Sequence, residues 1–132
     1  MIVLKEKDTA QATFDFVVMK LRKQGKPSIN ENGTCLYGSP RGLRCAIGHL
    51  MGNKAYKGNG GTVQSLIDEN EVAQPKYPWL LHLMQQAHDD AASMHMKDNN
   101  LFQATCAIKL IKAAKEEKLS PQSAQDWLDS LQ

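Results

Sequence analysis

The chain of 132 residues has no long apolar run and only three cysteines, and each absence excludes a class of protein. No stretch approaches the roughly 20 apolar residues that span a bilayer, so we expect no membrane-spanning helix and no membrane partner. After Met1, three apolar residues precede the first charged one, Lys5, whereas a secretory signal needs an apolar core of at least about seven. An odd number of cysteines favours reduced thiols in a cytoplasm over a disulfide framework.

The remaining composition is typical of a globular protein, with 42% hydrophobic, 23% charged and 6% aromatic residues. A chain of this length can bury about two-thirds of the surface that it exposes when unfolded. The sequence contains no internal repeat and no linker long enough to divide it. We therefore expect one globular domain that covers residues 1–132.

Charge is divided unevenly along the chain, although the net charge is only +2. Residues 1–60 hold 10 Lys/Arg and 4 Asp/Glu, whereas residues 61–132 hold 6 and 10. The basic half favours an anionic partner, which could be a nucleic acid, a nucleotide or an acidic protein surface, unless it is only a solvated helix surface. DNA is not expected as a partner, because the isoelectric point of about 8.4 is low for a DNA-binding domain. The two halves could also pair head to tail in a homo-oligomer.

Apolar spacing predicts helices over most of the chain. Phe14, Val17, Val18 and Leu21 follow the i, i+3, i+4, i+7 pattern of a helix that buries one face. Asp8 or Thr9 would cap its start, and Gly25 and Pro27 would end it. Further helices are expected at residues 45–51, from residue 62, at residues 79–95, at residues 101–118, and after the Ser-Pro pair at residues 120–121.

Residues 28–44 differ from the rest, because glycines and a proline interrupt them. We expect a short strand at residues 34–37, a turn at residues 39–42 and a returning strand at residues 43–44. A two-stranded hairpin is marginal in water, so it would have to lean on the helices. The predicted fold is mainly α (α+β), with five to six helices and one small β-hairpin.

Two cysteines and two histidines form the first candidate site. Cys35 and Cys45 flank the expected hairpin, and His49 lies one helical turn beyond Cys45. Zinc prefers thiolate and imidazole ligands, and a structural zinc site usually has four of them. His88 would have to be the fourth ligand. The alternative is that both thiols pack as small hydrophobic side chains where the hairpin meets a helix.

Cys45 also has features of a nucleophile. It begins the helix expected at residues 45–51, where the helix dipole and the neighbouring Arg44 would stabilise a thiolate. His88 is the candidate base. Asp89 is expected to be poorly placed to orient His88, because adjacent side chains point in different directions on a helix. The alternative to this site is an unreactive thiol and a half-buried histidine.

A glycine-rich stretch at residues 57–62 forms the candidate ligand site. It precedes an expected helix, whose free N–H groups favour an anion such as phosphate. It is not a Walker A motif, because no Gly-Lys-Ser/Thr follows the glycines. The alternative is a surface loop with an ordinary helix cap. A nucleotide-like ligand, with the tyrosine stacked on its base, would contact Arg41, Arg44, Lys54, Tyr56, Lys57, Gly60, Gly61 and Thr62.

A set of aromatic and methionine side chains is the last candidate, as a docking or stacking surface. Helical spacing more often places such residues in the core. Trp79, at a helix start beside two prolines, is the one that we expect to be exposed. The set comprises Tyr77, Trp79, Met84, Met94, Met96 and Trp127.

Residues 33–51 carry the most specific pattern of the chain, GTCLYGSPRGLRCAIGHLM. It resembles a motif of small phage and prophage proteins, roughly G-x-C-x-Y and, after a short gap, G-x-x-C-A-x-G-x-L. The Gln-Gly-Lys at residues 24–26 and the Gln-x-x-His-Asp at residues 85–89 match the same family. In the family, acidic residues and a tyrosine follow the motif, whereas this chain has Tyr56 without the acid. The resemblance brings no activity, cofactor or catalytic residue with it.

The resemblance implies a phage setting, in which small proteins without enzymatic motifs often act by stoichiometric binding. We therefore expect a non-catalytic phage accessory protein that counteracts host defence in the cytoplasm of the host cell. It would bind and inhibit a host protein or sequester a nucleotide-like signal, and it would need no cofactor. The alternatives are a Cys45-dependent hydrolase or transferase and a zinc-stapled interaction module.

Overall fold

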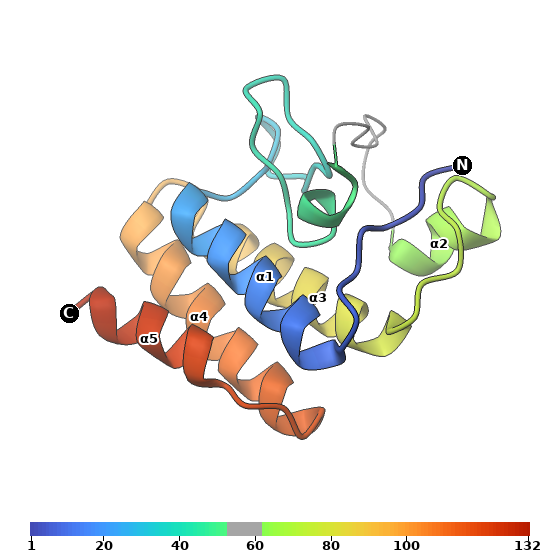
Figure 1. Cartoon of the computed structure of the whole chain (residues 1–132). Helices are drawn as coiled ribbons and strands as arrows, with labels where there is room; N and C mark the ends of the chain where they lie inside the picture. Colours follow the sequence, from blue (N-terminus) through green and yellow to red (C-terminus); the bar gives the residue numbers. More distant parts are fainter. Residues whose placement is uncertain (53–61) are drawn as a thin grey trace.

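A computed structural model describes residues 1–52 and 62–132 of the chain. The described part is mainly helical, as predicted (Figure 1). None of its helices is long and apolar enough to cross a membrane. The elements are α1 (Ala10–Gln24), the 3₁₀ turn η1 (Gly48–Leu50), α2 (Val63–Asp68), α3 (Pro78–Met94), α4 (Asn99–Glu116) and α5 (Gln122–Ser130).

Four of the helices form the body of the molecule. α4 packs between α3 and α5, and α1 lies across all three (Figure 1). Large side chains from each helix fill the space between them, because burial of apolar surface is the main favourable term in folding. The fully buried side chains include Phe14 and Leu21 of α1, Leu81 of α3, Phe102 of α4 and Trp127 of α5.

The ends of the first helix lie where the sequence predicts them. The Thr9 hydroxyl accepts a hydrogen bond from the Ala12 N–H at 3.0 Å and so caps the start. Gly25 ends the helix with a φ of 67°, and its N–H donates to the carbonyl of Leu21. α4 begins two residues before its predicted start, because the carboxylate of Asp98 caps it by accepting from the Leu101 N–H.

The expected β-hairpin is absent from the described residues, so this part of the prediction is wrong. Residues 25–52, which we name the loop segment, lie on one side of the helical body instead (Figure 1). The predicted turn forms, since Ser39 donates its N–H to Leu43 and accepts from Gly42. The described residues of the loop segment form an isolated antiparallel bridge between Ile29 and Cys35 instead of a regular strand pair.

Polar side chains explain why no strand ladder follows the turn. The Ser28 hydroxyl lies within hydrogen-bonding distance of the carbonyls of Leu36, at 2.7 Å, and Leu43, at 3.2 Å. The side-chain amide of Gln24 pairs with both the N–H and the C=O of Arg44, each at 2.9 Å. Side chains therefore satisfy backbone groups that a ladder would have used.

The helix expected at residues 45–51 is only the single turn η1.

Gly48 allows the two halves of the loop segment to touch. A Cβ atom added to it would lie 1.8 Å from the carbonyl oxygen of Tyr37 and 2.8 Å from its carbonyl carbon. These are backbone atoms, so they cannot rotate out of the way as the end of a side chain does. The close approach of residues 37 and 48 therefore requires glycine at this position.

Substitution of Gly48 by alanine is expected to destabilise the protein strongly, by about 3 kcal/mol or more, because the new methyl group overlaps backbone. Gly42→Ala is the matched control, since its φ is 82° and nothing lies within 4 Å of the added Cβ. It should cost about 1–2 kcal/mol for the left-handed backbone alone. Denaturant unfolding of both variants measures the difference, and equal losses would contradict the steric account.

Candidate functional site

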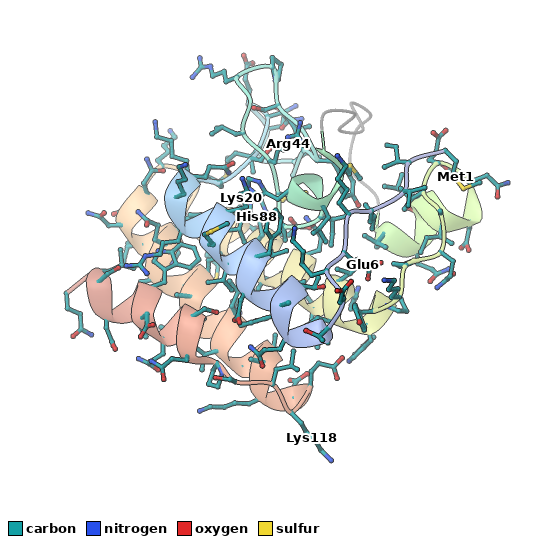
Figure 2. The ribbon with its side chains drawn as sticks, viewed as in Figure 1. Met1, Glu6, Lys20, Arg44, His88 and Lys118 are labelled. Carbon is teal, nitrogen blue, oxygen red and sulfur yellow. The ribbon has the colours of Figure 1, made fainter. Side chains whose placement is uncertain are left out.

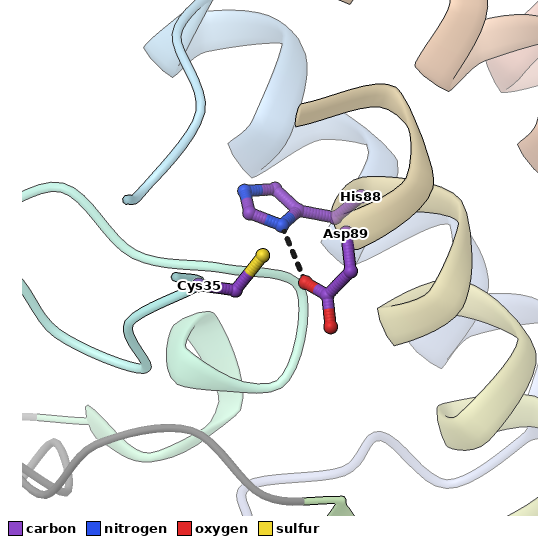
Figure 3. A group of neighbouring side chains, drawn as sticks. All are labelled: Cys35, His88 and Asp89. Atoms are coloured by element: carbon purple, nitrogen blue, oxygen red, sulfur yellow. Dashed lines mark hydrogen bonds and ion pairs between the residues drawn. The ribbon is translucent and has the colours of Figure 1, made fainter. Parts of the chain in front are cut away.

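Polar side chains of α3 face the loop segment and form the candidate site. Gln85, His88 and Asp89 lie on one face of α3, because residues three and four apart are neighbours on a helix. Cys35 of the loop segment meets them (Figure 3). One ligand atom each from Cys35, His88 and Asp89 lies within 4.8 Å of the others. The site thus joins segments that are far apart in the sequence.

The Asp89 carboxylate is held by two donors on the same oxygen. Its Oδ1 accepts from the side-chain amide of Gln85 at 2.7 Å and from Nδ1 of His88 at 2.9 Å (Figure 3). The expectation that Asp89 is poorly placed to orient His88 is therefore wrong. Adjacent side chains do leave the helix in different directions, but the carboxylate reaches back to the near edge of the imidazole ring.

The other ring nitrogen of His88 holds the loop segment. Nε2 accepts a hydrogen bond from the backbone N–H of Ser28 at 3.1 Å, and the ring is fully buried. Because a donor faces Nε2, that nitrogen must present its lone pair, and the proton lies on Nδ1, where Asp89 accepts it. Phe102 also packs edge-on against the ring, with centroids 5.6 Å apart. His88 therefore has one defined tautomer and two occupied nitrogens.

The predicted zinc ligands are only partly brought together. Among the described residues, the group close enough to share an ion comprises Cys35, His88 and Asp89 rather than Cys45 or His49. In addition, Nδ1 of His88 carries a proton, and the lone pair of Nε2 points to Ser28. A metal at Nδ1 would move the proton to Nε2 and set it against the Ser28 N–H. The hydrogen bonds of His88 thus disfavour metal binding at this cluster.

His49 lies apart from this cluster, and its side chain is partly buried. Its Nε2 is buried without a hydrogen-bond partner in the described part of the chain. Burial, followed by the nearby charge of Arg44, lowers the pKa of His49 to about 4. The neutral ring is therefore the stable form near neutral pH.

Both thiols of the site favour the protonated form. Cys45 is 1% exposed, and its Sγ accepts from the Gly48 N–H at 3.4 Å. Burial, the largest effect, raises the pKa of Cys45 to about 12. Burial, and then the hydrogen bond to the Asp89 carboxylate, also raise the pKa of Cys35 far above the usual range. Neither environment activates a thiolate.

Arg44 does not activate the Cys45 thiol as expected from the sequence. Its guanidinium donates to the carbonyl oxygen of Gly48 at 3.1 Å and also to that of Gly52. Figure 2 shows Arg44 at the base of the loop segment, with Lys118 at the opposite end of the molecule. Arg44 therefore acts as a clamp on the backbone around η1.

A cavity of about 320 Å³ opens beside Asp89. Oδ1 of Asp89 is occupied by His88 and Gln85, whereas the second oxygen points away from His88 and Cys35 (Figure 3). The side chain of Asp89 is 37% exposed and lines this cavity. Among the described residues, those that line the cavity are Thr34, Cys35, Tyr37, Cys45, Thr62, Gln85 and Asp89.

The described residues among those predicted to bind an anion have different surroundings. Arg41 is exposed and lines a separate groove of about 980 Å³, whereas Arg44 is bonded to the backbone. Thr62 accepts from the Ser65 N–H at 3.1 Å, which caps α2, and it also lines the Asp89 cavity. The other predicted positions lie outside the described residues; these are Lys54, Tyr56, Lys57, Gly60 and Gly61.

The aromatic and methionine set divides between the core and the surface. Trp79 is 56% exposed, as predicted, and stacks on His82 with ring centroids 5.1 Å apart. Met84 and Trp127 are buried in the core, whereas Met94 and Met96 are exposed. The Tyr77 hydroxyl donates to the carbonyl of Asp8, which ties the chain ahead of α1 to the start of α3.

Comparisons with known proteins add nothing to this description, since no family model, curated protein or solved structure matches the chain. Sequence reasoning missed Ser28 and Gln85 as members of the site. The Gln-x-x-His-Asp spacing at residues 85–89 was the available signal, because it places three polar side chains on one helix face. No comparable signal marks Ser28, whose contribution to His88 is a backbone N–H.

Alkylation of the native protein with iodoacetamide at pH 7.5 is expected to leave Cys45 and Cys106 unmodified while the protein stays folded. Both are buried, and burial raises the pKa of each thiol. Cys35, which is partly exposed, should react more slowly than free cysteine. Mass spectrometry of tryptic peptides measures the rates, with denatured protein as the control. Rapid labelling of Cys45 in the native state would contradict this and favour the nucleophile.

Proposed function

We propose that this chain is a non-catalytic binding protein that sequesters a small nucleotide-like ligand in the Asp89 cavity. The observation that carries the proposal is the pair of hydrogen bonds made by the two ring nitrogens of His88. Both of its nitrogens serve to fix Asp89 and the loop segment, so the imidazole is not free to take a proton from a thiol. What remains exposed is an oriented carboxylate in a cavity, which suits recognition.

The environment of the cysteines supports binding over catalysis. A cysteine nucleophile needs a lowered pKa or a base within hydrogen-bonding reach. The pKa of Cys45 is raised to about 12, and burial, followed by the neighbouring Asp89, raises the pKa of Cys35 and favours its protonated thiol. A Cys45-dependent hydrolase or transferase would need the opposite electrostatics.

The biological setting of the proposal comes from the resemblance to small phage and prophage proteins. In that setting a stoichiometric binder acts by removing a signal or by occupying a host protein. A cavity of about 320 Å³ with a carboxylate and thiols in its wall has the size and mixed polarity of a small-molecule site. We therefore place the ligand in this cavity and the activity in counter-defence.

One observation favours a host protein as a second candidate target. Trp79 is 56% exposed and stacks on His82 at the start of α3. Exposed tryptophans are enriched among the residues that dominate binding energy at protein interfaces. The Trp79 surface is separate from the Asp89 cavity in its lining residues, so the two targets are distinguishable by mutation.

A panel of mononucleotides, dinucleotides and cyclic nucleotides tests the proposed function. At 100 times its Kd, a bound ligand is expected to stabilise the folded protein by about 2.7 kcal/mol, which raises the melting temperature. Differential scanning fluorimetry measures the shift, and calorimetric titration confirms stoichiometric binding without turnover. Trp79→Ala is the control that should retain binding, because Trp79 is exposed and lies outside the lining of this cavity. If no nucleotide in the panel changes the melting temperature, the proposal is wrong.

A further inference from the structure

The orientation of Asp89 defines which kind of chemical group the cavity can accept. Oδ1 already accepts from Gln85 Nε2 at 2.7 Å and from His88 Nδ1 at 2.9 Å. These donors fix the plane of the carboxylate, and each of them has a second fixed contact. Gln85 accepts from the Ile47 N–H at 3.0 Å, and His88 accepts from the Ser28 N–H. The second oxygen, which we call the outward oxygen, is therefore held pointing away from His88 (Figure 3), on a side chain that lines the cavity.

The outward oxygen can only accept hydrogen bonds, and it has two lone pairs to offer. It therefore selects a ligand edge with N–H donors and repels an edge that presents a lone pair. The rest of the wall includes the weakly polar thiols of Cys35 and Cys45. Such a wall suits the face of a planar ring better than a small hydrated ammonium ion, which would lose its water without replacement.

We propose that the Asp89 cavity recognises the donor edge of a guanine base, whose N1–H and N2 amino group lie side by side. This rests on the proposed function, since it names the base of the nucleotide-like ligand. Both donors can converge on the outward oxygen of Asp89. Adenine places a ring lone pair beside its amino group, and hypoxanthine lacks the amino group, so each forms a weaker set of bonds with this oxygen. Base selectivity therefore arises from one fixed acceptor.

Asp89→Asn provides a sharp test, because the hydrogen bonds from Gln85 and His88 predict which way the new amide will face. The side-chain oxygen of asparagine can stay between Gln85 and His88, which both donate to that position. The NH₂ group then points outward, where the carboxylate oxygen was. The substitution thus converts the accepting group of the cavity into a donor while the buried contacts stay in place. It should therefore remove the preference for the guanine edge while the protein stays folded.

The experiment is calorimetric titration of the full chain with the 5′-monophosphates of guanosine, inosine, adenosine and xanthosine. All four share the same sugar and phosphate, so differences report the base. The wild-type protein is expected to bind the guanosine nucleotide at least tenfold more tightly than the other three. Asp89→Asn should lose at least tenfold of that affinity, because its outward NH₂ group opposes the N1–H and amino donors of guanine.

Asp90→Asn is the matched control, because Asp90 is the exposed neighbour of Asp89 on α3 and the substitution removes the same charge. It should leave all four affinities within twofold of the wild-type values. Equal binding of the four nucleotides would overturn the guanine assignment while the proposed function stands. Unchanged preference in Asp89→Asn with a wild-type melting temperature would overturn it as well. If neither these nor other nucleotides bind, the proposed function itself fails.

Discussion

The hydrogen bond from the Ser28 N–H to Nε2 of His88 is the contact on which the site depends. It fixes the tautomer of a fully buried imidazole, and the tautomer then directs Nδ1–H to Asp89. We call this series of hydrogen bonds, from Ser28 through His88 to Asp89, the relay. Through it, one backbone amide of the loop segment determines the orientation of a carboxylate on α3. Because buried polar groups are costly when they lack partners, every step of the relay supports the next.

The same relay explains how an irregular segment is held without a sheet. The loop segment contributes backbone groups, and polar side chains satisfy them: Ser28 within the segment, Gln24 at the end of α1 and Gln85 on α3. Arg44 adds a clamp around η1 through the carbonyl of Gly48. The helical body therefore serves as a rigid support that positions a loop, which is where binding residues commonly lie.

The sequence predicts the features that are local in origin. Thr9 and Gly25 lie at the two ends of α1 as expected, because a helix cap involves residues that are neighbours in the chain. The hairpin fails because Ser28 and Gln24 compete for its backbone groups, and no pattern reveals which carbonyls a side chain will reach. The spacing of Gln85, His88 and Asp89 indicates a shared helix face, but not that Cys35 and Ser28 lie against it. Those contacts are set by tertiary packing.

The most direct test of this account is the tautomer of His88, read from long-range ¹H–¹⁵N correlation spectra of uniformly labelled protein near neutral pH. We predict the pattern of a neutral ring with the proton on Nδ1 and an unprotonated Nε2, unchanged by a metal chelator. A proton on Nε2, or nitrogen shifts that change when a chelator is added, would contradict the relay. The orientation of Asp89 and the binding chemistry inferred from it would then lose their basis.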